Sequence, residues 1–151
     1  MRIARYNIKT EVVRVPRTGL MLAGDIMADL QAGYAKYLVE KLNDPEGPGI
    51  AALRCPRDIV RIIAAGKSGR DALHAVTGYF TELYKSDPAA RGLASEPLFT
   101  PLAECRLHAP MRPGKVLAVA DCPDSQAPSV WLKAAGTIIG PTRDLEKPAG
   151  I

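Results

Sequence analysis

Cysteine and histidine are the side chains most able to do chemistry in this chain, and they are few. The sequence holds three cysteines and two histidines in 151 residues. Cys105 and His108 have the spacing of two ligands that could share one metal ion. No second pair of ligands follows them, so a buried thiol and a strand-edge imidazole are the preferred interpretation. The odd number and wide separation of the cysteines argue against a disulfide framework.

Overall composition excludes several classes of protein. An apolar content of 47% with 24% charged residues predicts a folded chain rather than a disordered one. The net charge of +4 is modest, and no basic face with interleaved aromatic residues indicates nucleic-acid binding. No apolar run approaches the roughly 18 residues that a membrane-spanning helix needs. A signal peptide's apolar core is also missing, so we expect a cytoplasmic protein with no membrane partner.

The first third of the chain predicts strands followed by a helix. Residues 2–8 alternate loosely between apolar and polar, which is typical of a half-buried strand. Residues 11–15 are rich in valine and predict a second extended segment. Residues 19–29 indicate a hairpin whose turn is at Gly24. Asp29 stands where it could cap the helix that follows.

The middle of the chain predicts two further helices. Residues 43–49 are a loop by composition. A helix is expected to begin at Pro56 and to stop at Gly66. A longer amphipathic helix is expected to start at Ser68.

The last third returns to strands after a proline-containing loop over residues 89–104. Residues 105–109, 115–120 and 130–133 each have the composition of a short strand. Strands, then helices, then strands again predict an α+β fold.

The order of residues from 102 to 120 resembles a segment of the fumarylacetoacetate hydrolase family. The positions that match the segment are Leu102, Arg106, Leu107, Ala109, Pro110, Pro113 and Lys115, with support from Leu132-Lys133 and Gly140-Pro141. The resemblance implies a family-type N-terminal domain over residues 1–110. Residues 111–151 would then be the truncated start of the family's catalytic β region.

The same resemblance implies that the family's catalytic groups are missing here. In that family a histidine acts as general base beside a magnesium or manganese ion, under a lid segment. The aligned histidine position holds Gln126, whose carboxamide cannot accept a proton. Only residues 127–129 stand where the lid would be, and Asp144 and Glu146 are misplaced as metal ligands. We therefore expect no catalytic residue, metal or cofactor in this chain, although a partner subunit could hold Mg or Mn.

These departures favour a non-catalytic small subunit, a pseudoenzyme that docks on a larger enzyme subunit. Strands that the missing catalytic domain would have covered should expose their edges to a partner. Trp131 and Leu132 are the expected interface residues, because aromatic and aliphatic anchors are common at interface centres. Self-association is the alternative way to cover them.

Two other readings stay open. The chain could belong to an active hydrolase, isomerase or decarboxylase acting on keto acids, with catalytic residues from another chain or a remodelled pocket. In that pocket Asp121 would be the base or Cys122 the nucleophile, although no histidine stands near Cys122 in the sequence. Alternatively, the chain could bind a small acid through Arg106, Lys115 or Lys133.

Overall fold

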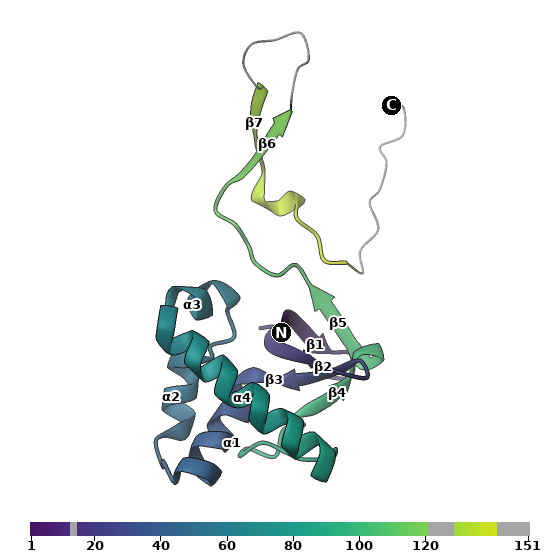
Figure 1. The fold of residues 1–151 in the computed structure, drawn as a ribbon. Helices are drawn as coiled ribbons and strands as arrows, with labels where there is room; N and C mark the ends of the chain where they lie inside the picture. Colours follow the sequence, from purple (N-terminus) through teal and green to yellow (C-terminus); the bar gives the residue numbers. More distant parts are fainter. Residues whose placement is uncertain (13–14, 121–128, 142–151) are drawn as a thin grey trace.

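The computed structural model describes residues 1–12, 15–120 and 129–141, and they form an α+β fold (Figure 1). A five-stranded antiparallel sheet has the strand order β4-β3-β2-β1-β5. Its strands are β1 (Arg2–Ile8), β2 (Arg17–Leu22), β3 (Ile26–Asp29), β4 (Phe99–Pro101) and β5 (Cys105–His108). Four helices pack beside it: α1 (Leu30–Leu42), α2 (Gly47–Arg54), α3 (Ile59–Ala64) and α4 (Gly66–Ser86). We call the sheet and these helices, residues 1–108, the body.

The β2–β3 hairpin and the start of α1 form as the sequence predicts. Gly24 has a φ of 77° and Asp25 a φ of 55°, so the turn uses the left-handed region that glycine adopts without strain. The side chain of Asp29 accepts a hydrogen bond from the backbone N–H of Ala32 at 3.0 Å. This bond satisfies one of the free donors at the start of the helix.

The predicted strand over residues 11–15 is wrong where the structure describes it. Residues 11, 12 and 15 lie outside any strand, and β2 begins only at Arg17. The chain turns here because the backbone N–H of Glu11 donates to the carbonyl of Ile8 at 3.1 Å. Valine content alone could not reveal this turn, because it reflects packing preference rather than chain direction.

The helical region contains one helix that the sequence did not predict. Helix α2 begins at Gly47, inside the stretch expected to be a loop, and Pro48 occupies its first turn, where a missing N–H costs nothing. The helix expected from Pro56 begins instead at Ile59, capped by Asp58. Helix α4 starts at Gly66, which was expected only to end the preceding helix.

Of three apolar clusters among the described residues of the body, the two larger lie on opposite faces of the sheet. On one face, strand residues pack against α1, α2 and α4 around a cluster that includes Leu20, Ala28, Leu30, Tyr34, Leu38, Val76 and Phe80. The curled sheet encloses a second cluster of Tyr6, Ile8, Met27 and Cys105 on the other face. Helices α1 and α4 approach closely at Gly33, where an added Cβ would lie 2.1 Å from the Phe80 ring.

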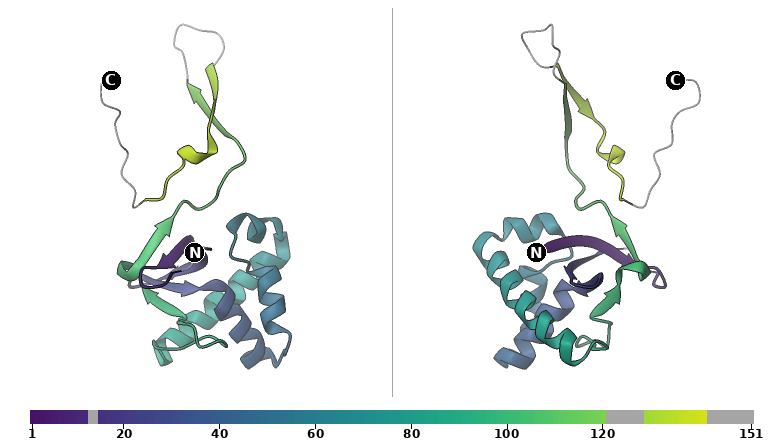
Figure 2. Two further views of the ribbon diagram at one scale, coloured as in Figure 1. Left: turned by 180° about the vertical axis from the view of Figure 1, so that it is seen from behind. Right: turned by 45° about the vertical axis from the view of Figure 1, so that its right-hand side comes forward.

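A separate two-stranded sheet follows the body. Strand β6 (Val116–Ala120) pairs antiparallel with β7 (Ser129–Lys133). Figure 2 shows this hairpin projecting away from the sheet and helices in both views. After β7 the chain forms a short 3₁₀ turn, η2 (Ala135–Thr137), and returns toward β5.

Candidate interaction surface

The β6–β7 hairpin places four of the five leucine and valine side chains of its two strands on one face. Leu117 pairs with Leu132, and Val119 pairs with Val130. Because directly paired residues share a face and alternate residues along a strand do too, all four side chains lie together. We call these four residues the apolar face.

This apolar face is open to solvent in the isolated chain. The exposed fractions are 63% for Leu117, 65% for Val119, 57% for Val130 and 71% for Leu132. A contiguous group of exposed aliphatic residues commonly marks an interaction site, whereas single exposed leucines do not.

Trp131 and Leu132, the predicted interface residues, are both exposed in this chain but lie on opposite faces of the hairpin. Trp131 pairs with Ala118 and is 51% exposed. Leu117, Val119 and Val130 were not among the predicted interface residues. The alternation of 117 with 119 and of 130 with 132 is the signal that could have found them.

Cys105 and His108 do not meet at a metal site. They are three residues apart on one strand, so their side chains point to opposite faces of the sheet. The Cys105 thiol lies in the second apolar cluster and donates to the carbonyl of Pro101 at 3.5 Å. Among the residues that the structure describes, no three His, Cys, Asp or Glu side chains are grouped to hold a metal ion.

The two cysteines of the body lack the environment of reactive thiols. Cys55 is fully buried in the main cluster, and burial raises its pKa to about 12. Burial also raises the pKa of Cys105, to about 11. Since the thiolate is the nucleophile, both side chains are unreactive near neutral pH.

The two weak catalytic candidates, Asp121 and Cys122, lie outside the described residues. So do Gln126, at the family's histidine position, and Asp144 and Glu146, which were expected not to bind a metal. Of the basic residues suggested for binding a small acid, Arg106 lines a pocket at the end of β5. Lys115 immediately precedes β6 and Lys133 ends β7, and both are exposed.

A buried ionic cluster ties the first hairpin to α1. Arg17 contacts Glu11 at 2.5 Å and Asp29 at 3.4 Å. Burial raises the pKa of Asp29, and the hydrogen bond from Ala32 and the charge of Arg17 oppose that rise. Because Asp29 also caps α1 and is nearly inaccessible, this cluster organises the body and is not open to a ligand.

The geometry thus defines an α+β body with a projecting hairpin whose apolar face is uncovered. The sequence matches no protein-family model and no curated protein at a significant level. Within the described residues, no helix has the length and apolar character needed to cross a membrane.

Proposed function

We propose that this chain is a non-catalytic interaction module, a small subunit that docks through the β6–β7 hairpin on a larger enzyme subunit. The observation that carries the proposal is the uncovered apolar face of Leu117, Val119, Val130 and Leu132. A two-stranded hairpin is at best marginally stable in water by itself. Packing against another surface would bury the apolar face and so stabilise the hairpin.

The hairpin offers a partner both side chains and backbone. Burying an aliphatic side chain completely is worth about 1.5–3 kcal/mol relative to leaving it exposed. Strands β6 and β7 pair only with each other among the described residues, so each has an outer edge with no neighbouring strand. Such edges pair readily with a strand of another chain.

Charge favours a different protein over a second copy as the partner. Lys115 precedes β6 and Lys133 ends β7, so both lie at the open end of the hairpin, and the two acidic residues between the strands, Asp121 and Asp124, lie outside the described residues. Two copies packed with these ends together would bring like charges together, whereas a partner with an acidic rim there would be attracted. The chain's net charge of +4 acts in the same direction.

The resemblance to the fumarylacetoacetate hydrolase family suggests which partner to try first. The larger subunit would be a family-like chain, or another enzyme of the same pathway, that carries the catalytic base and its Mg or Mn ion. In this arrangement the present chain supplies a docking body and no reacting group.

The test is reconstitution of the complex from purified components, with hairpin substitutions as the probe. We expect a stoichiometric complex by light scattering, and at least tenfold weaker association for the Leu117→Ser, Leu132→Ser double variant. The matched control is Leu53→Ser with Ile63→Ser, two comparably exposed aliphatic residues on α2 and α3.

Three results would contradict the proposal. The hairpin variant could bind as well as the wild type, or the control could lose binding to the same extent. The chain could also form a stable homodimer through the hairpin, in which case the apolar face serves self-association. Unfolding by urea must show that both double variants keep a folded body.

A further inference from the structure

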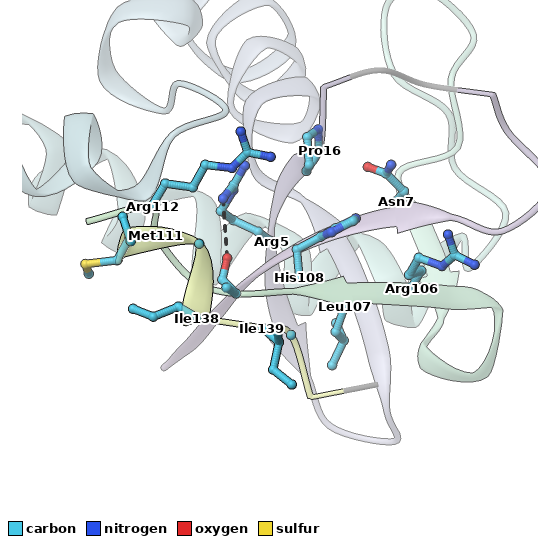
Figure 3. A pocket seen from close by; sticks show the side chains of 14 residues that line it. Arg5, Asn7, Pro16, Arg106, Leu107, His108, Met111, Arg112, Ile138 and Ile139 are labelled. Carbon is cyan, nitrogen blue, oxygen red and sulfur yellow. Dashed lines mark hydrogen bonds between the residues drawn. The ribbon is translucent and has the colours of Figure 1, made fainter. Parts of the chain in front are cut away.

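A pocket of about 510 Å³ lies between the β5 edge of the sheet and the segment that returns from the hairpin (Figure 3). Strands β1 and β5 supply Arg5, Asn7, Arg106 and His108, and residue Arg112 follows β5. The returning segment supplies an apolar wall that includes Ile138 and Ile139.

Strand register brings the polar side chains together. Arg5 is directly paired with His108, and Asn7 with Arg106. These four residues share the face of the sheet on which Ile3 and Leu20 pack against the helices. The polar group therefore continues that face toward the β5 edge, beyond the apolar cluster.

The positive charges that line the pocket have no carboxylate beside them among the described lining residues. The described residues that line it include Arg5, Arg106 and Arg112 and no carboxylate. None of these arginines takes part in an ion pair with a described residue. Arg17, by contrast, is neutralised by two carboxylates. Uncompensated guanidinium groups in a concave site attract anions.

Arg5 is held in place and still has a free donor. One of its terminal nitrogens donates to the carbonyl of Ala109 at 3.3 Å. Its Nε is buried and has no hydrogen-bond partner among the described residues. A buried donor without a partner costs free energy, and an anion in the pocket offers one way to satisfy it.

The returning segment fits tightly against β5. At Gly140 an added Cβ would lie 3.0 Å from the carbonyl oxygen of Leu107 and 3.1 Å from the Cα of His108. Figure 3 shows Ile138 and Ile139 on the Leu107 side of β5, whereas the arginines lie on its His108 side, so the pocket extends around the edge of the strand.

We propose that this pocket binds a small organic dianion, a phosphate group or a dicarboxylate, through Arg5, Arg106 and Arg112. Guanidinium groups match carboxylate and phosphate oxygens in a two-pronged geometry. Figure 3 shows Arg5 and Arg112 on one side of His108 and Arg106 on the other, so charge is available at both ends of a ligand. This inference is independent of docking by the hairpin.

The experiment is calorimetry on the full chain with inorganic phosphate, succinate and, as a monoanion, acetate. We expect binding of phosphate or succinate in preference to acetate, and which of the two binds better identifies the ligand chemistry. The Arg106→Gln, Arg112→Gln double variant should lose about tenfold or more per arginine. Arg61→Gln with Arg70→Gln, two exposed changes on α3 and α4 outside the pocket lining, is the charge-matched control.

Several outcomes would overturn the assignment. These are no binding of either dianion, acetate binding as tightly as the dianions, or equal losses of affinity in the control double variant and in the pocket variant. Binding of an acidic partner protein at these arginines, with neither small dianion bound, would also do so. The hairpin variant with Leu117→Ser and Leu132→Ser should keep dianion binding, so failure of docking and failure of this site are distinguishable.

Discussion

Strands β1 and β6 are both antiparallel and rich in aliphatic residues, yet their surroundings differ completely. In β1, Tyr6 and Ile8 are buried in the curled sheet, and Ile3 packs against the helix-side cluster. In β6, Leu117 and Val119 are mostly exposed. The body therefore has the contacts that stabilise it within its own chain, whereas the hairpin does not. Alternation predicts a strand over residues 2–8 and composition predicts one over residues 115–120, but only the neighbouring elements determine whether the apolar side of each strand is covered.

The largest expected effect is a loss of stability of the body when Arg17 is replaced. Replacing Arg17 with Met leaves the buried carboxylate of Asp29 without its cation, which typically costs about 3–5 kcal/mol of unfolding free energy. Urea denaturation measures the loss. The control is Lys67→Met, which breaks the exposed pair with Asp71 and should leave the midpoint unchanged. Equal midpoints for the Arg17 variant and the wild type would show that the cluster does not stabilise the body.

A smaller effect is expected where the helices touch. Gly33→Ala places a methyl group against the Phe80 ring and should destabilise the body by about 1–3 kcal/mol. Gly78→Ala on α4 meets nothing within 4 Å and should instead stabilise it by about 0.5–1 kcal/mol. Thermal unfolding of both variants measures the sign and size of each change in stability. Changes of the same sign would mean that the α1–α4 contact is looser than described.

The smallest expected difference in free energy is that of local opening of the hairpin, and it can be measured on the unmodified chain. Backbone amides of β6 and β7 should exchange with deuterium far faster than those of β1 and β2, because few buried contacts oppose local opening. Hydrogen exchange followed by mass spectrometry measures the difference. Protection of the hairpin equal to that of β1 in the isolated chain would contradict the contrast between the two regions. Addition of the docking partner should slow exchange in β6 and β7.

Local signals account for the parts of the fold that the sequence predicts well. Gly24 and the capping carboxylate of Asp29 act within a few residues, so the β2–β3 hairpin and the start of α1 could be recognised. The same reasoning failed at Pro48. Proline and glycine there indicate a loop, but proline is also favoured in the first turn of a helix. Both structures fit the local sequence, and the tertiary contacts of this segment favour helix α2.

The candidate sites were only partly predictable for a different reason. Leu132 could be proposed because its strand was recognisable, but the full apolar face depends on the β6–β7 register. The pocket depends on pairing between β1 and β5, which are far apart in the sequence. Arg106 was one of several basic candidates, and nothing near it in the sequence points to Arg5.

That long-range pairing also bears on the order of folding. The hydrogen bond from Arg5 to Ala109 joins residues separated by 104 positions. Closing so long a loop is slower than forming the β2–β3 turn or the first helix. During synthesis on the ribosome, strands β1 to β3 and helices α1 to α4 have all been synthesised before β5 is available to pair with β1. The arginine pocket is therefore among the last features to be assembled, and a nascent chain that lacks β5 has no means of forming it.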